Sequence, residues 1–157
     1  MVKRSLIVLF ACVLFLGSKA QKAIADGLDY TNAIGVKFYP AGISFKHFID
    51  GKNAVEGLGY FYNRGARFTA LYEIHNDISA LDGLKWYLGP GAHVGAFNSK
   101  YGGGVALGLD GVLGLDYKFA DAPINVSLDF QPSFELLNYY GDNRLTIWGG
   151  IGVRYVF

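Results

Sequence analysis

The chain has 157 residues, a formal net charge of +1 at pH 7, and Phe, Trp or Tyr at 16% of its positions. This length suits a single domain. Because the charges nearly balance and no polybasic tract is present, nucleic acid is not expected as a partner. The 22 glycines stand beside only four prolines, a combination that favours crowded β-structure over disorder.

The first residues predict an export signal. Residues 3–4 are basic, residues 6–17 form an apolar run, and residues 18–20 place Ser and Ala where a signal peptidase reads. The apolar run is shorter than the roughly 20 residues that a membrane-spanning helix needs. We therefore predict a signal peptide over residues 1–20 and one domain over residues 21–157.

Two details of this segment bear on the chemistry of the exported chain. A second possible cleavage site follows Ala25. Cys12 lies inside the apolar run rather than after it, so lipidation at this residue is not expected. Because Cys12 is the only cysteine, its removal with the signal excludes disulfides, thiolate nucleophiles and cysteine metal sites.

Eight candidate strands follow, separated by turns rich in Gly, Pro, Asn or Asp. They cover residues 33–39, 42–48, 54–62, 66–75, 84–97, 105–119, 124–136 and 144–157. Their lengths bracket the roughly 10 residues of a tilted β-strand that crosses a bilayer. This order, without helical segments between the strands, predicts an all-β, eight-stranded, antiparallel, up-and-down barrel.

Side chains alternate along these strands with a period of two. In the sixth strand, Leu107, Leu109 and Leu113 share one face, whereas Asp110 and Asp116 share the other. Every charged residue in the last four strands lies on the same face of its strand as these two carboxylates do. Each strand therefore separates two environments, and no helical period competes.

Glycine placement indicates that the charged face is the inner one. A narrow eight-stranded interior needs small residues beside large ones, and the apolar face is too bulky to fit inside it. The glycines on the charged face are Gly89, Gly91, Gly95, Gly108, Gly114, Gly150 and Gly152. We therefore expect a transmembrane barrel; the alternative is a soluble lipocalin-type ligand-binding barrel with its apolar face inside.

The lumen would then hold charges of both signs, which are expected to form ion pairs because an unpaired buried charge is costly. The candidates are Lys37, Lys46, Glu56, Arg67, Glu73, Lys85, Asp110, Asp116, Lys118, Asp129, Glu135, Arg144 and Arg154. A self-sealed interior is favoured over a narrow pore, since eight strands leave only a filled lumen. The assignment is weaker in the first four strands, where Leu58 and Leu71 share the polar face.

An even number of strands places both chain ends on one side of the barrel, which would be the periplasmic side. The connections on the other side are short, so only one cluster is a candidate for recognition at the cell surface. Its residues are Lys100, Tyr101, Tyr139, Tyr140 and Asp142.

The last strand alternates up to a terminal aromatic residue, Phe157, with Tyr155 two positions before it. This ending resembles the C-terminal insertion signal of outer-membrane proteins, and the chain resembles small eight-stranded barrels of the OmpA-transmembrane-domain and OmpX type. The resemblance implies insertion into outer-membrane lipid of a Gram-negative-type bacterium by the barrel-assembly machinery, with Tyr155 and Phe157 as recognition residues. It transmits no activity, because such barrels serve many roles.

The main rival class is a lipid-modifying enzyme. Some eight-stranded barrels modify lipid A with a His-x-Ser pair, but here His47, His75 and His93 are followed two positions later by Ile, Asp and Gly. No catalytic triad is apparent, and the histidines lack metal-ligand spacing. We therefore expect a monomeric structural or surface-interaction protein with no catalytic residue, metal or cofactor.

Overall fold

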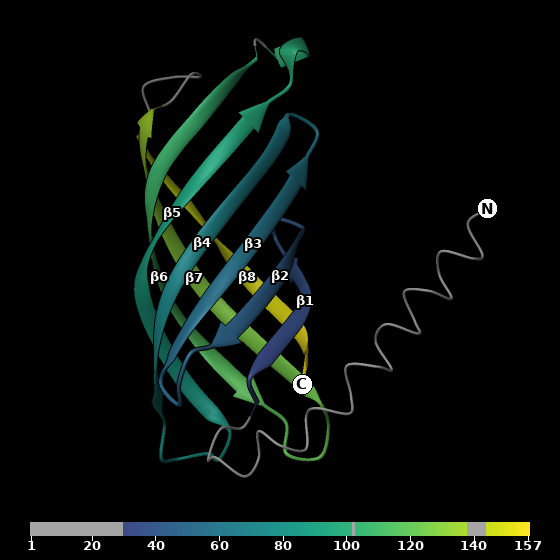
Figure 1. Cartoon of the computed structure of the whole chain (residues 1–157), viewed down its shortest axis with the longest axis vertical. Helices are drawn as coiled ribbons and strands as arrows, with labels where there is room; N and C mark the ends of the chain where they lie inside the picture. Colours follow the sequence, from purple (N-terminus) through teal and green to yellow (C-terminus); the bar gives the residue numbers. More distant parts are fainter. Residues whose placement is uncertain (1–29, 102, 138–143) are drawn as a thin grey trace, which may run out of the picture.

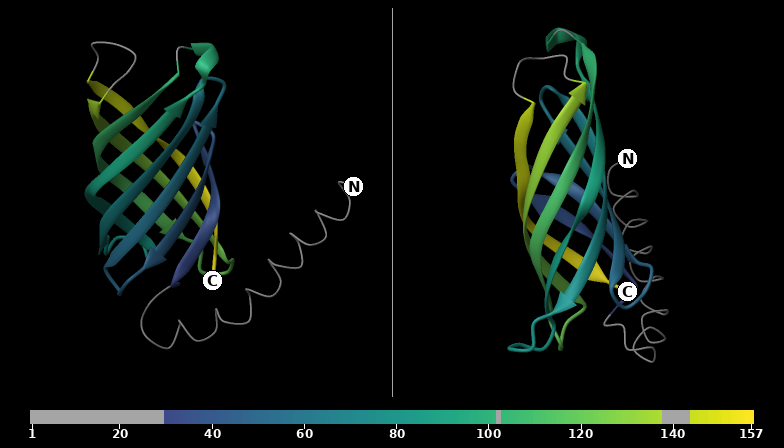
Figure 2. Two further views of the ribbon diagram at one scale, coloured as in Figure 1. Left: turned by 45° about the horizontal axis from the view of Figure 1, so that its top comes forward. Right: turned by 90° about the vertical axis from the view of Figure 1, so that its left-hand side faces the viewer.

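The structure is a computed structural model that describes residues 30–101, 103–137 and 144–157. These residues form a closed barrel of eight antiparallel strands in up-and-down order, as Figures 1 and 2 show. The strands are β1 (Asn32–Phe38), β2 (Gly42–Phe48), β3 (Asn53–Tyr62), β4 (Gly65–Asp77), β5 (Leu84–Phe97), β6 (Gly104–Lys118), β7 (Ile124–Leu137) and β8 (Leu145–Val156). The predicted fold is confirmed, and the predicted strand ends agree with these to within two residues.

Outside the strands, a short 3-10 turn, η2 (Ser99–Tyr101), lies between β5 and β6. Within the described ranges, no helix is long and apolar enough to cross a membrane. The predicted signal peptide, residues 1–20, falls outside the described residues.

The first and last strands close the barrel. β1 pairs with β8 from Ala33, opposite Val156, to Phe38, opposite Ile151. The Asn32 N–H donates to the carbonyl of Phe157 at 2.8 Å, and the Phe157 N–H donates to the carbonyl of Asn32 at 2.8 Å. The end of the chain is therefore part of the wall. We call the end of the barrel that carries these two residues the terminal rim, and the opposite end the distal rim.

The wall is not of equal height all round. β1 and β2 have 7 residues each, whereas β5 has 14 and β6 has 15. At about 3.3 Å per residue, the short strands extend roughly half as far as the long ones. Figure 1 shows the β1–β2 hairpin ending well below the other hairpins. The distal rim therefore slopes down to this hairpin.

The two faces of the wall differ as the alternation predicts. Large apolar side chains such as Leu109 and Leu128 are exposed on the outside, whereas Asp110, Asp116 and Asp129 are buried inside. The same rule holds in the first four strands. The two leucines on the polar face there are buried because they pack in the lumen beside Tyr60, Tyr87 and Val112. The charged face is thus the inner face throughout.

Candidate functional site: the barrel lumen

A buried ion cluster, which we call the proximal cluster, is centred on Lys46 of β2. The Lys46 Nζ lies 2.8 Å from Glu73, 3.3 Å from Asp116 and 3.8 Å from the nearer oxygen of Glu56. All four side chains are almost fully buried. The cluster joins β2, β3, β4 and β6, which are brought together only by closure of the barrel.

Arg154 of β8 extends the proximal cluster across the seam of the barrel. Its guanidinium forms an ion pair with Glu56 and donates hydrogen bonds to Ser44 Oγ at 2.7 Å and Ser127 Oγ at 2.8 Å. It also donates to the side-chain carbonyl of Asn125 at 3.2 Å. One side chain therefore connects β8 to β2, β3 and β7.

Two rings pack against the proximal cluster. The His75 Nε2 lies 2.9 Å from Glu73 Oε2, and the imidazole stacks on Tyr87 with 4.8 Å between ring centroids. The Lys46 Nζ lies 4.4 Å from the centroid of the Tyr87 ring. The Tyr87 hydroxyl donates to Asp129 at 2.9 Å, and Asp129 also accepts from Lys37 Nζ at 2.8 Å. Tyr87 therefore connects this cluster to a further ion pair.

A second ion cluster, the distal cluster, lies around Arg67 of β4. The Arg67 guanidinium is 2.6 Å from Asp110 and 3.5 Å from Glu135. His93 lies between the same two carboxylates, with Nδ1 2.8 Å from Asp110 and Nε2 3.0 Å from Glu135. Ser133 accepts from Arg67 at 2.6 Å and donates to Asp110. The Trp148 ring lies over the guanidinium, 4.2 Å from its carbon atom.

Glycines make room for these large side chains. Gly114 lies opposite Tyr87 in the β5–β6 register, and Gly108 lies opposite His93. A Cβ on Gly114 would lie 2.5 Å from the Tyr87 ring, and one on Gly108 would lie 2.4 Å from the His93 ring. Small residues therefore stand directly across from large ones, as the glycine pattern predicts for a filled interior.

We expect the substitution Gly114→Ala to lower the free energy of unfolding by about 1–3 kcal/mol, because the added methyl overlaps the buried Tyr87 ring. The matched control is Gly57→Ala on the outer face, where the nearest atom to the added Cβ is 4.0 Å away. The measurement is urea unfolding of the refolded barrels, followed by tryptophan fluorescence. Equal stabilities of the two variants would contradict the tightly filled lumen.

Ten of the thirteen predicted lumen residues take part in buried ion pairs. These are Lys37, Lys46, Glu56, Arg67, Glu73, Asp110, Asp116, Asp129, Glu135 and Arg154. Lys85 is half-buried and pairs instead with the exposed Asp77 at the terminal rim, at 3.2 Å. The alternation therefore identified the charged residues, and the pairing followed from closure of the sheet.

Two of the predictions are wrong. Arg144 precedes β8 and is exposed at the distal rim, where its backbone carbonyl accepts from the Glu135 N–H at 2.7 Å. Lys118 ends β6, and its ammonium donates to the carbonyls of Phe119 and Ala122 rather than to a carboxylate. In both cases the alternation continues past the end of the enclosing wall, so the side chain has left the lumen.

The predicted loop cluster is only partly described. Lys100 is exposed on the η2 turn, whereas Tyr139, Tyr140, Asp142 and the side chain of Tyr101 lie outside the described part of the structure.

At the opposite rim, the exposed Asp50 accepts hydrogen bonds from the Asn53 side chain and from the backbone N–H groups of Lys52 and Asn53. These bonds lower the pKa of Asp50.

Sequence reasoning missed the aromatic part of the lumen. Tyr60, Tyr87 and Trp148 all point inward, and Trp148 lies 5.2 Å from Tyr60 between ring centroids. Each of them shares the face of its strand with charged or glycine residues, so the alternation contained the signal.

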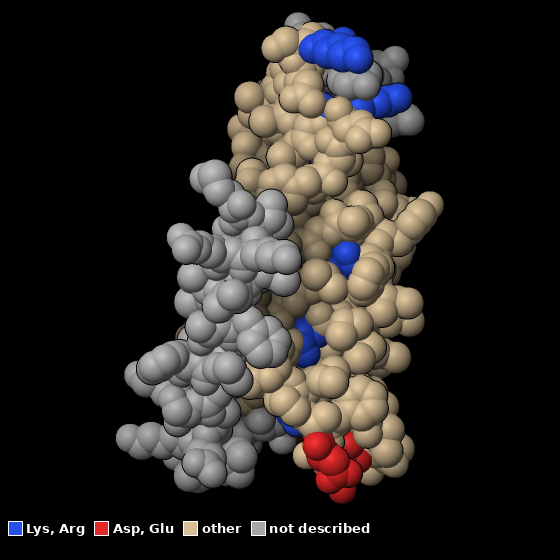
Figure 3. Space-filling view, turned by 90° about the vertical axis from the view of Figure 1, so that its right-hand side faces the viewer, with Lys and Arg blue, Asp and Glu red and all other residues tan. Residues whose placement is uncertain are grey.

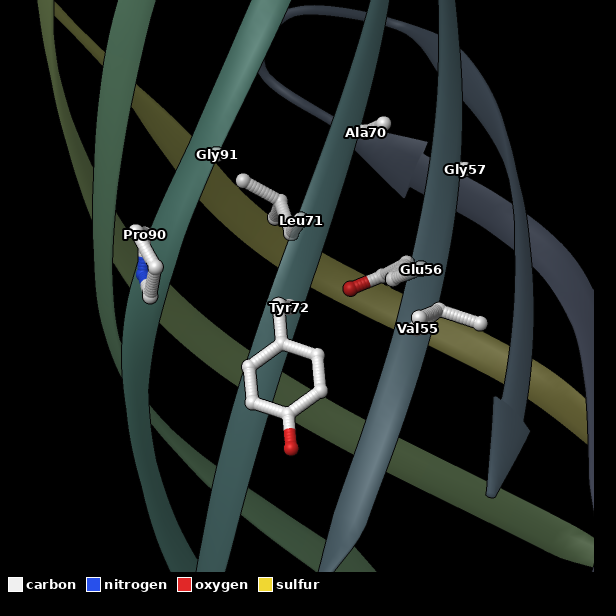
Figure 4. Close-up of a pocket in the computed structure, with 8 residues that line it drawn as sticks. All are labelled: Val55, Glu56, Gly57, Ala70, Leu71, Tyr72, Pro90 and Gly91. Atoms are coloured by element: carbon white, nitrogen blue, oxygen red, sulfur yellow. The ribbon is translucent and has the colours of Figure 1, made fainter. Parts of the chain in front are cut away.

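A shallow hollow of about 420 Å³ lies over β3, β4 and β5, as Figure 4 shows. Its lining includes Gly57, Ala70, Pro90 and Gly91, whose side chains are small or absent, and Tyr72 and Val55 lie beside them. The buried Glu56 also lines it. This feature is a depression in an otherwise apolar wall.

The histidine rings contact carboxylates, Arg67 and Asn32. In the ranges the structure describes, no group of three His, Cys, Asp or Glu side chains could hold a metal ion. No family model matches the chain, and neither the curated proteins nor the solved structures contain a match.

Proposed function

We propose that this chain is a small monomeric barrel that spans the outer membrane of a Gram-negative-type bacterium and has a structural or surface-interaction role. The observation that carries the proposal is the outer wall. Apart from Tyr72, its large exposed side chains on the middle of the strands are Leu, Ile, Val and Phe, whereas each charged residue of the described strands falls at an inward position of the alternation. An apolar band around a closed barrel suits lipid, and a polar one suits water.

The polar residues at outward positions support the same proposal. Asn32, His47, Asn53 and Asn76 all lie near the terminal rim, and His47 Nδ1 is 2.8 Å from Asn32 Oδ1. Aromatic rings gather at this level too, where Tyr117 packs edge-on against Phe119 at 4.8 Å. Polar and aromatic side chains of this kind are typical of the membrane–water interface.

The test is to express residues 21–157, refold them in detergent, and compare gel mobility before and after boiling together with far-UV circular dichroism. We expect a β-rich, heat-modifiable species that forms only with detergent or lipid. A water-soluble β-rich monomer would instead support a lipocalin-type protein and would overturn the proposal.

The proposed route of assembly runs through the barrel-assembly machinery and the terminal aromatic residues. Deleting Phe157 removes both its ring and the two backbone hydrogen bonds with Asn32, so we expect little barrel to reach the membrane. The variant Phe157→Ala keeps the backbone bonds and loses only the ring. If the ring is the recognition element, both variants should assemble poorly in cells, whereas Phe157→Ala should still refold in detergent. Normal assembly of Phe157→Ala in cells would show that the machinery does not recognise the Phe157 ring.

We also propose that the lumen does not conduct ions. Long side chains of the described strands fill it and are almost completely buried. The largest of them are Arg154, Tyr60, Tyr87, Lys37, Lys46, Leu58, Leu71, His75, Gln131, Glu56, Glu73 and Asn125. In planar lipid bilayers the refolded protein should show no steady conductance; stable single-channel steps would favour the narrow pore.

No catalytic activity is assigned in this proposal. Ser133 is the serine of the distal cluster, and its hydroxyl bonds to Asp110 and Arg67, while the ring nitrogens of His93 lie against carboxylates. This geometry orients ion pairs and does not activate a serine nucleophile. Incubating the refolded barrel with lipid A and phospholipids, followed by mass spectrometry, would reveal any lipid modification.

A further inference from the structure

The wall is interrupted above the β1–β2 hairpin. β1 ends at Phe38, opposite Ile151, and β2 begins at Gly42, opposite Tyr60. Among the described residues, residues 145–149 of β8 therefore pair with no strand on the β1 side, and residues 61–62 of β3 pair with none on the β2 side. We call this gap the notch. Its sides are these two segments, and its floor is the hairpin tip, residues 39–41.

The sides and floor of the notch are apolar. Leu145 and Ile147 are 67% and 69% exposed, the largest values among the large hydrophobic residues of the strands, because no strand covers them. Phe61 is exposed on the other side, and the tip consists of Tyr39, Pro40 and Ala41, with Tyr39 90% exposed. An uncharged tip of this kind can lie within hydrocarbon or at its boundary.

Aromatic rings close the back of the notch. Trp148 of β8 lies 5.2 Å from Tyr60 and 6.3 Å from Tyr62 of β3, as measured between ring centroids. These contacts cross the gap behind the hairpin and cover Arg67. At the floor, Gly150 has a φ of 144°, and a Cβ there would lie 2.1 Å from the Phe38 carbonyl oxygen. The hairpin tip is thus seated against β8.

Basic side chains stand above both sides of the notch. Arg144 directly precedes the β8 side, and Arg64 lies in the turn that follows the β3 side; both are exposed. The terminal rim carries charges of both signs, with Asp50, Asp82 and Asp121 exposed there together with Lys52. On the side drawn in Figure 3, blue lies at the distal end and red at the terminal end, and between them is a largely tan wall in which a few Lys or Arg atoms are visible.

We propose that the notch binds one anionic lipid of the outer leaflet. Its acyl chain packs against Leu145, Ile147 and the ring of Trp148, and its phosphate lies between Arg64 and Arg144. This proposal rests on the membrane location proposed above. The Phe157 N–H points to β1, and backbone N–H groups alternate in direction along a strand, so the N–H groups of Leu145 and Ile147 face the notch. They can donate hydrogen bonds to the phosphate and ester oxygens of a lipid. An apolar peptide side chain has no oxygen that could accept these bonds.

A second copy of the chain fits the notch less well. In a shared membrane, β8 of both copies would run in the same sense, from the distal rim to the terminal rim, whereas two facing edges of identical strands pair symmetrically only when they run antiparallel. A lipid needs no such alignment. Its phosphate complements the charges of Arg64 and Arg144, and its acyl chain complements the apolar side chains of Leu145 and Ile147.

The experiment uses Trp148 as its reporter. The chain has two tryptophans, so Trp86→Phe leaves Trp148 alone, and the protein is placed in phosphatidylcholine nanodiscs with a small fraction of lipid that carries brominated chains. Quenching should be greater with brominated phosphatidylglycerol than with brominated phosphatidylcholine. Replacing Arg64 or Arg144 by Ala should weaken this preference by about fivefold each. Lys100→Ala is the matched control, since this exposed base lies on the η2 turn, away from the notch, and should change nothing.

Each outcome decides between occupants. Equal quenching by the two lipids, or equal effects of Arg144→Ala and Lys100→Ala, would overturn the lipid site. Loss of the preference on adding inorganic phosphate would reduce it to a simple anion site, and a dimer in sedimentation would assign the notch to a second copy. All variants are first checked for heat-modifiable folding. Failure of the unsubstituted protein to enter lipid contradicts the proposed membrane location, whereas the quenching results of folded variants test the lipid site.

Discussion

Replacing Arg154 by Met should lower the free energy of unfolding of the barrel by about 3–5 kcal/mol, the cost of removing one partner from a buried ion pair. Arg154 is the only residue through which β8 donates to Glu56, Ser44 and Ser127 together in the described structure. Its loss leaves Glu56 facing Lys46 at 3.8 Å as its remaining cation. Because the variant keeps a long apolar side chain, the lost free energy reports the ionic contacts rather than a cavity.

The measurement is equilibrium unfolding of the refolded protein in urea, with a double-mutant cycle. If the Arg154–Glu56 pair accounts for the effect, adding Glu56→Gln to Arg154→Met should recover part of the lost stability. Asp77→Asn is the control, because it breaks the exposed pair with Lys85 and should change stability by less than about 1 kcal/mol. Equal losses in Arg154→Met and Asp77→Asn would mean that the lumen is hydrated and its charges are screened.

Replacing Leu128 by Arg should make insertion and folding in lipid less favourable by about 2–4 kcal/mol. Leu128 is 57% exposed and lies inside β7, four residues from the strand's terminal-rim end, where it would face the hydrocarbon. Arg at Ile151, which lies opposite Leu128 on β8, should have a similar effect. Leu109 on β6 lies opposite Phe134, nearer the distal rim, and is also exposed, so Arg there should destabilise the barrel as well.

The control for depth is Leu137→Arg at the distal end of β7. Leu137 is 58% exposed, so it matches Leu128 in exposure but not in depth. The cost of Arg near the interface is only about 0–1 kcal/mol. Folding into vesicles, followed by heat-modifiable gel mobility, would separate the two positions. Normal assembly of the Leu109, Leu128 and Ile151 variants would contradict the assigned lipid face and with it the membrane location.

The sequence alone was enough to predict the strands and their faces. Period-two alternation is a local property that any strand with two different environments must show, so Leu109 and Asp110 could be assigned to opposite faces without a partner strand. The glycine positions were also informative, because glycine on the charged face, as at Gly108 and Gly114, indicates that this face is the crowded interior. The wrong assignments, Arg144 and Lys118, fall where the alternation continues but the enclosing wall does not.

The partners and the shape of the wall depended on the tertiary structure. The strand register around the closed barrel brings Arg154 to Glu56 and places His93 between Asp110 and Glu135. Arg154 and Glu56 are 98 positions apart in sequence, so no local pattern indicates their contact. The notch has the same origin. The lengths of β1 and β2 were predictable, but only the pairing of Phe38 with Ile151 reveals which part of β8 lacks a neighbour. Alternation is set by each strand separately, whereas register is set by the whole closed sheet.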